Sequence, residues 1–107
     1  MPRILIVEDS AIDQTLVRSL LESQQDIDEV ELDVVGDGNA ALARIASFEP
    51  DIVVTDLVMP GMGGLELLDA IKVRSPLIPV IVVTSRGSEE TAVEALQRGA
   101  ASYVPKH

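Results

Sequence analysis

The sequence predicts an α/β fold built on a parallel β-sheet, and three observations support this. Short β-branched runs alternate along the 107 residues with amphipathic stretches that carry helix start signals. Three of these runs contain no polar residue, which is typical of strands covered on both faces. The length suits one compact domain. We therefore expect five strands and four helices in strict alternation, joined by right-handed crossovers and wound on both sides of the sheet.

The five expected strands differ in how deeply they should be buried. Residues 4–7, 52–54 and 80–83 are uninterrupted apolar runs and should be the central strands. Residues 30–34 alternate apolar with charged side chains and residues 101–104 are short and mixed, so each of these two strands should be an edge with one face less deeply buried. The sheet order that fits is 2-1-3-4-5. In this order the chain reverses direction between strands one and three, where open α/β sheets bind ligands.

Four amphipathic stretches with start signals fall between the strands. The first begins at Ser10, the second follows residues 37–39, the third opens near residues 63–64, and the fourth runs from Ser88 to Gly99. The side chains expected to face the core are Ile12, Leu16, Leu20 and Leu21 in the first, Leu42, Ile45 and Ala46 in the second, Leu65, Leu68 and Ile71 in the third, and Ala92 and Leu96 in the fourth.

Composition excludes several classes of function. Eighteen acidic against eight basic residues give a net charge of −10, which repels nucleic acids and anionic membrane surfaces. The absence of cysteine excludes disulfides, zinc thiolate sites and thiol nucleophiles. No apolar stretch approaches the roughly 20 residues that span a bilayer, and the first residues lack the features of a signal peptide. We therefore expect a cytoplasmic domain that binds neither nucleic acid nor membrane.

Polar side chains stand where the predicted strands end. Glu8 and Asp9 follow the first strand, Asp56 the third, Thr84 the fourth and Lys106 the fifth. Taken singly, each is more often a solvated side chain or a helix cap. Because the carboxyl ends of parallel strands meet at one edge of the sheet, we expect all five to converge on one pocket.

This group of residues has the chemistry of a phosphoryl site. Carboxylates 4 Å apart repel by about 4 kcal/mol at an effective dielectric constant of about 20, so three of them need a cation. Oxygen ligands without cysteine favour Mg²⁺ held by carboxylates, waters and a phosphate oxygen. Lys106 adds a positive charge and Thr84 a hydroxyl donor for an anionic group. Asp56 is the candidate nucleophile for an aspartyl phosphate, and the Pro/Gly loop after it can turn a carbonyl to the metal.

With these residues in place, the chain resembles the receiver domains of two-component response regulators, which have a flavodoxin-like fold, over essentially all of its length. The resemblance implies that Asp56 accepts phosphate from a histidine kinase or a histidine-phosphotransfer protein. The marks that carry the resemblance, in chain order, are Glu8-Asp9 after an apolar strand, Thr-Asp56-Leu-Val-Met-Pro-Gly-Met-Gly-Gly, Val-Val-Thr84-Ser and Tyr103-Val-Pro-Lys106.

The same resemblance implies a role for each residue of the site. Asp9 would bind Mg²⁺ directly, Glu8 through a water, and the phosphoacceptor and the Val58 carbonyl would complete the contacts. Thr84 would close on the phosphoryl group while Tyr103 changes rotamer, altering the surface around the fourth helix and the fifth strand. No turnover of another substrate is expected, only phosphotransfer and slow self-hydrolysis.

The chain departs from the family pattern near its end. Proline usually follows the family's lysine, whereas Pro105 precedes Lys106 here. Family members continue into a fifth helix, which this chain lacks, so we expect it to be truncated before that helix. The apolar surface beside the fifth strand would then need a partner, such as a second copy of the chain or a downstream output domain.

Three other functions remain as alternatives. A Mg²⁺-dependent phosphohydrolase with an aspartyl intermediate typically needs a second carboxylate two residues after the nucleophile, where this chain has Val58. A receiver-like interaction module that is never phosphorylated would have no need of Asp9, Asp56, Thr84 and Lys106. A nucleotide or flavin carrier would need a glycine-rich phosphate cradle after the first strand, where residues 8–10 stand instead.

Overall fold

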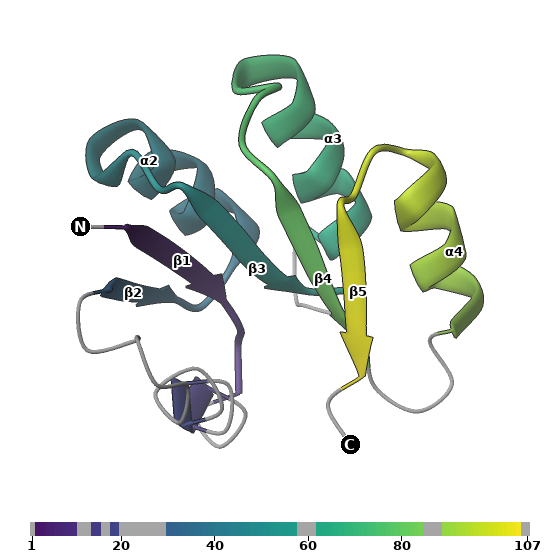
Figure 1. The fold of residues 1–107 in the computed structure, drawn as a ribbon, viewed down its shortest axis with the longest axis horizontal. Helices are drawn as coiled ribbons and strands as arrows, with labels where there is room; N and C mark the ends of the chain where they lie inside the picture. The colour runs from purple at the N-terminus through teal and green to yellow at the C-terminus, as the bar shows by residue number, and fades with distance from the viewer. Residues whose placement is uncertain are drawn as a thin grey trace.

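The computed structural model describes residues 2–10, 14–15, 18–19, 30–57, 62–84 and 89–105. These residues include a five-stranded parallel sheet in the order β2-β1-β3-β4-β5, which confirms the predicted order (Figure 1). Each strand extends the predicted run by a residue or two or shifts it by one. The strands are β1 (Arg3–Val7), β2 (Glu31–Val35), β3 (Ile52–Asp56), β4 (Val80–Thr84) and β5 (Ser102–Pro105).

Three helices pack on one face of the sheet, namely α2 (Gly38–Phe48), α3 (Gly64–Arg74) and α4 (Glu89–Gln97) (Figure 1). The expected first helix lies largely outside the described residues, and so do all four of its predicted core positions. No helix in the described part of the chain is both long and apolar enough to cross a membrane.

The central strands bury side chains on both faces, as their uninterrupted apolar runs predict. Leu5, Val53 and Val82 belong to the larger core cluster under the three helices. Ile6 and Val54 point the other way and form a second cluster with Val83. This division follows from the two-residue period of a strand, which sends successive side chains to opposite faces.

The edge strands are only partly as predicted. β2 is half-buried along most of its length, which agrees with its alternating pattern. All four residues of β5 are exposed, with Tyr103 43% and Val104 46% accessible, so the expectation of one buried face on this strand is wrong. β2 and β5 each have a single neighbour in the sheet, so strand pairing does not explain the difference. β2 is also in contact with α2, whose Arg44 pairs with Asp33.

Two predicted core positions are wrong, and both are helix residues. Ala46 of α2 is exposed, whereas Phe48 near it is buried. Leu96 of α4 is 39% accessible, whereas Ala95 is fully buried. The apolar residues of both helices cover more than one face, so the 3.6-residue period allows two orientations, and contact with the sheet decides between them. The remaining predicted positions in α2, α3 and α4 are buried or partly buried.

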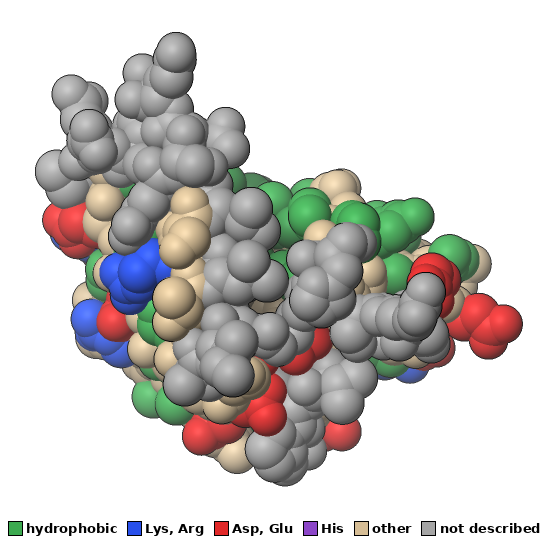
Figure 2. Space-filling model, turned by 90° about the horizontal axis from the view of Figure 1, so that it is seen from below, with side chains coloured by type: hydrophobic (Ala, Val, Ile, Leu, Met, Phe, Trp, Pro, Cys, Tyr) green, Lys and Arg blue, Asp and Glu red, His purple; other side chains and the backbone are tan. Residues whose placement is uncertain are grey.

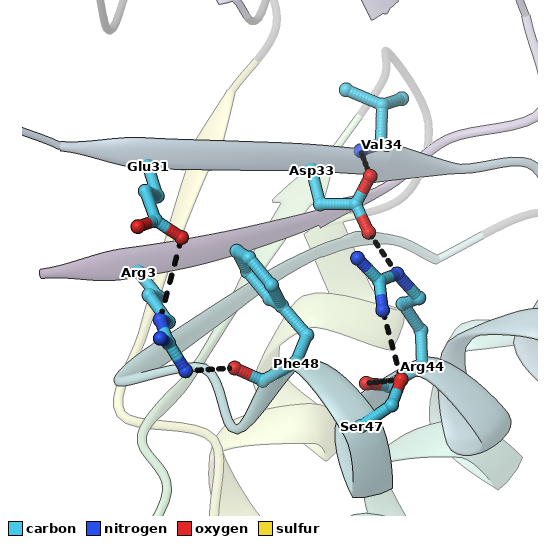
Figure 3. Close-up of polar contacts among 7 residues, drawn as sticks. All are labelled: Arg3, Glu31, Asp33, Val34, Arg44, Ser47 and Phe48. Atoms are coloured by element: carbon cyan, nitrogen blue, oxygen red, sulfur yellow. Dashed lines mark hydrogen bonds and ion pairs between the residues drawn. The ribbon is translucent and has the colours of Figure 1, made fainter.

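The C-terminal end of α2 is attached to β1 and β2 through Phe48 (Figure 3). The guanidinium groups of Arg3 and Arg44 lie 5.7 and 5.1 Å from the centre of the Phe48 ring. Arg3 also donates to the Phe48 carbonyl at 2.8 Å and pairs with Glu31 of β2 at 3.4 Å. Arg44 pairs with Asp33, also of β2. These contacts attach the start of β1 to β2 and to the end of α2.

Candidate metal centre at the carboxyl end of the sheet

Three carboxylates meet where β1 and β3 end. Val7 is the register partner of Thr55, so Glu8 and Asp9 follow β1 at the level where Asp56 completes β3. One carboxylate oxygen from each of these three acids lies within 4.8 Å of the others. The structure thus brings together three of the five polar residues that the sequence places at strand ends.

The three acids differ in their exposure to solvent. Glu8 is 2% and Asp56 6% accessible, whereas Asp9 is exposed. The Ser10 backbone N–H donates to Glu8 Oε1 at 3.2 Å. Acidic side chains gather on the face seen in Figure 2, toward which β4 and β5 point in Figure 1. The centre therefore combines two sheltered carboxylates with one that is exposed to solvent.

The donor set fits a hard divalent cation. All three groups offer oxygen, and among the described residues no sulfur or imidazole ligand joins the cluster. Mg²⁺ takes oxygen ligands and commonly binds one or two protein carboxylates, leaving its other positions to water and phosphate oxygens. A cation of this kind would offset the mutual repulsion of the three carboxylates.

Thr84 lies on the strand next to the phosphoacceptor candidate. Asp56 is the register partner of Val83, and Thr84 is the following residue and the last of β4. Its side chain is buried, with the residue 4% accessible. Tyr103 of β5 is paired with Val82, two residues before Thr84, and is therefore not a member of the acidic group. The two remaining predicted site residues, Lys106 and Val58, lie outside the described residues.

A glycine that the sequence marks only as a helix start brings α3 against this centre. The Gly64 N–H donates to the Leu57 carbonyl at 3.0 Å. A Cβ atom at Gly64 would lie 2.5 Å from the carbonyl oxygen of Asp56, a separation that a real side chain does not tolerate. Gly64 therefore permits the first turn of α3 to rest on the end of β3. The Gly-Gly pair was the available sequence signal, but two glycines equally suit a turn.

A second close contact at a glycine lies at the start of α2. A Cβ atom at Gly38, the first residue of α2, would lie 2.9 Å from three side-chain atoms of Met62. Met62 is partly buried and packs against the core. Met62, two residues before α3, is thus packed closely against the first residue of α2.

Comparison with known proteins points to one family. The family model for the response regulator receiver domain matches residues 4–107. The regulatory protein LuxO of Vibrio cholerae is 41% identical over 101 residues, which are 94% of this chain and 21% of LuxO. A protein-glutamate methylesterase/protein-glutamine glutaminase of Myxococcus xanthus is 42% identical over 105 residues, or 97% of this chain and 30% of that enzyme. The chain thus spans less than a third of the length of either relative.

A solved structure agrees with the sequence relatives. The Mn²⁺-bound form of the response regulator Rcp1 superimposes with a TM-score of 0.84 at 31% identity. The superposition covers 100% of this chain and 82% of Rcp1. The likeness therefore extends to the whole sheet and to the helices packed on it.

Proposed function

This chain belongs to the family of response regulator receiver domains of two-component signalling, and on that premise we propose that Asp56 accepts a phosphoryl group from a phosphohistidine. The donor would be a sensor histidine kinase or a histidine-phosphotransfer protein. The observation that carries the proposal is the convergence of Glu8, Asp9 and Asp56 within 4.8 Å at the ends of two adjacent strands. Because like charges repel at this distance, carboxylates with no shared ligand would be more stable apart.

The transfer exchanges one bond to phosphorus for another. A carboxylate oxygen of Asp56 attacks the phosphorus, and the phosphorus–nitrogen bond of the phosphohistidine breaks. The histidine keeps the electron pair and leaves as neutral imidazole when its other ring nitrogen carries a proton. Because Asp56 is 6% accessible, the donor must bring its phosphoryl group to a sheltered carboxylate. The same enclosure limits the access of water to the acyl phosphate.

Glu8, Asp9 and Asp56 are the described residues that would hold Mg²⁺, with the Val58 carbonyl as a further contact. When bound, Mg²⁺ supplies positive charge that offsets the carboxylates and the phosphoryl oxygens. The Mn²⁺-bound form of Rcp1 supports a divalent cation in a domain of this fold. The Lys106 ammonium would pair with a phosphoryl oxygen, a role for which a point charge on a flexible stem is suited.

Phosphorylation would change the surface formed by α4 and β5. It adds a charge of about −1.5 to −2 at Asp56. Thr84 follows Val83, the register partner of Asp56, and its hydroxyl would donate a hydrogen bond to a phosphoryl oxygen. Tyr103 is half-exposed and lies on β5, where its register partner is Val82, two residues before Thr84. Its side chain would then change rotamer. The exposed Val93 and Leu96 of α4 give this surface an apolar character. A downstream output domain, another partner or a second copy of the chain would read the change.

The location follows from the same features. A net charge of −10 opposes contact with nucleic acid or an anionic membrane surface. We propose that the domain lies in the cytoplasm, the compartment in which sensor kinases present their phosphohistidine.

Phosphotransfer to Asp56→Asn provides the test. The wild-type chain should acquire one acid-labile phosphoryl group from acetyl phosphate or from a phosphorylated kinase, and only with Mg²⁺ present. Asp56→Asn should acquire none, whereas Glu66→Gln, which removes an exposed acid from the first turn of α3, should be labelled like the wild type. Labelling of Asp56→Asn at the wild-type level would refute the assignment.

The same assay separates the alternatives. A receiver is labelled once and loses the phosphoryl group slowly, so repeated turnover of a simple phosphate ester would favour the phosphohydrolase. A wild-type chain that remains unlabelled with every donor would favour the interaction module.

A further inference from the structure

Helix α4 is attached to the domain by little apolar surface. Its only buried residues are Ala92 and Ala95, and its larger side chains Val93 and Leu96 are 51% and 39% accessible. The neighbouring α3, by contrast, buries two leucines and an isoleucine. Because hydrophobic stabilisation grows with the apolar area removed from water, α4 is the least firmly packed of the three described helices.

Polar contacts hold the C-terminal end of this helix against α3. Arg98, which follows the last residue of α4, donates through Nη1 to Asp69 of α3 at 2.6 Å and through Nη2 to Glu94 of α4 at 2.5 Å. The hydrogen bond that Arg98 donates to Glu94 and then the charge of Asp69 raise the pKa of Arg98. The side chain of Lys72, one turn after Asp69, lies over Gly99, with its Cε atom 3.4 Å from the Cβ position there.

The N-terminal end of α4 lies closer in the chain to the proposed phosphoryl site. Its first two residues, Glu89 and Glu90, are exposed. Only residues 85–88 separate them from Thr84, which would contact the phosphoryl group. A displacement that begins at Thr84 therefore reaches α4 at the end opposite to Arg98.

Building on the proposed function, we propose that the ion pair between Arg98 and Asp69 is a restraint that opposes the switch. In the switch α4 changes its orientation relative to α3, and the pair, which joins the two helices in the orientation seen here, favours that orientation. Exposed ion pairs contribute modestly, so the restraint tunes the switch equilibrium by about two- to fivefold and does not decide it alone.

Binding of beryllofluoride, a phosphoryl mimic, tests the restraint. A ligand that selects one conformation binds more tightly when that conformation is more populated. Arg98→Gln and Asp69→Asn should each lower the apparent dissociation constant for beryllofluoride with Mg²⁺ by about two- to fivefold, the range expected for an exposed pair. The double variant should gain no more than either single variant. Arg74→Gln, which removes an exposed arginine in the last turn of α3, is the matched control and should bind like the wild type.

Amide NMR shifts of α4, β5 and α2 report the outcome. In the two variants, α4 and β5 amides should move toward their beryllofluoride-bound positions before ligand is added, while α2 amides stay in place. Unchanged or weaker binding in both Arg98→Gln and Asp69→Asn would overturn the restraint. A wild-type chain that does not respond to beryllofluoride would instead contradict the proposed function. Asp69→Asn removes the charge of the α3 partner and leaves the sequence of α4 unchanged. It therefore tests the pair even if Arg98→Gln lowers the melting temperature.

Discussion

The Cβ position of Gly64 lies 2.5 Å from the carbonyl oxygen of Asp56 and 2.6 Å from the Cα atom of Leu57. At the preceding Gly63 the nearest atom to the same position, the Leu57 carbonyl oxygen, is 3.8 Å away. Gly63 also has a φ of −74°, which any residue adopts. Of the two adjacent glycines, only Gly64 is therefore required by space. The proposed phosphoacceptor owes its position partly to a residue that has no side chain.

Gly64→Ala should destabilise the domain and displace the end of β3. Inserting a methyl group into closely packed surroundings typically costs about 1–3 kcal/mol. We expect the free energy of unfolding in urea to fall by that amount and Mg²⁺-dependent labelling by acetyl phosphate to slow. Gly63→Ala, the neighbouring control, should change stability by less than about 0.5 kcal/mol. Equal losses for the two substitutions would contradict the role of Gly64.

Asp9→Asn should stabilise the chain when divalent cations are removed. Carboxylate oxygens within 4.8 Å of one another repel by at least about 3.5 kcal/mol at an effective dielectric constant of about 20. Because Asp9 is exposed, solvent screening reduces the gain to about 1 kcal/mol.

The same variant should lose the rise in melting temperature that Mg²⁺ gives the wild type, since ligand binding stabilises only a chain that binds it. Thermal unfolding in EDTA and in Mg²⁺ measures both effects. Glu66→Gln should keep the full rise in melting temperature with Mg²⁺. If Glu66→Gln also loses this rise, the loss in Asp9→Asn would be due to the change in net charge and not to a lost Mg²⁺ ligand.

Thr84→Ala should separate labelling from switching. The hydroxyl is proposed to contact the phosphoryl group only after transfer. The rate of labelling by acetyl phosphate should therefore stay within about twofold of the wild-type rate, a smaller change than the loss of one typical hydrogen bond would cause. The shifts of α4 and β5 amides on phosphorylation should become smaller. Thr84→Ser keeps the hydroxyl and should retain the response. A full response in Thr84→Ala would exclude the hydroxyl from the switch.

Phe48→Leu should weaken the attachment of α2 to the edge of the sheet. The ring is 8% accessible and lies within 6 Å of two guanidinium groups. The smaller side chain loses both the aromatic contacts and some packing, so we expect about 1–2 kcal/mol of destabilisation in urea. Val73→Ala shortens a side chain that is 83% accessible and should cost less than about 0.5 kcal/mol. If the two variants lose equal stability, the ring contacts contribute nothing.

The strand order was predictable because burial on one face or two leaves a direct mark on composition. The run Val80 to Val83 has no polar residue and is central, whereas Glu31 to Val35 alternates and lies at an edge. The meeting of Glu8, Asp9 and Asp56 follows from that order, since parallel neighbours present their carboxyl ends together. Helix faces were less predictable. Both Ala95 and Leu96 are apolar, and only the close approach of α4 to the sheet selects the alanine.

The class of fold, the order of the strands and the edge at which the acidic residues meet could all be predicted from the amino-acid sequence. This was possible because hydrophobic periodicity and strand-end chemistry are local properties of the chain. Only the tertiary structure decided that Gly64 admits α3 to the carbonyl of Asp56, that Phe48 lies between two arginines, and that Arg98 reaches Asp69 on another helix. Those contacts join residues distant in sequence, and their distances depend on how the elements pack together.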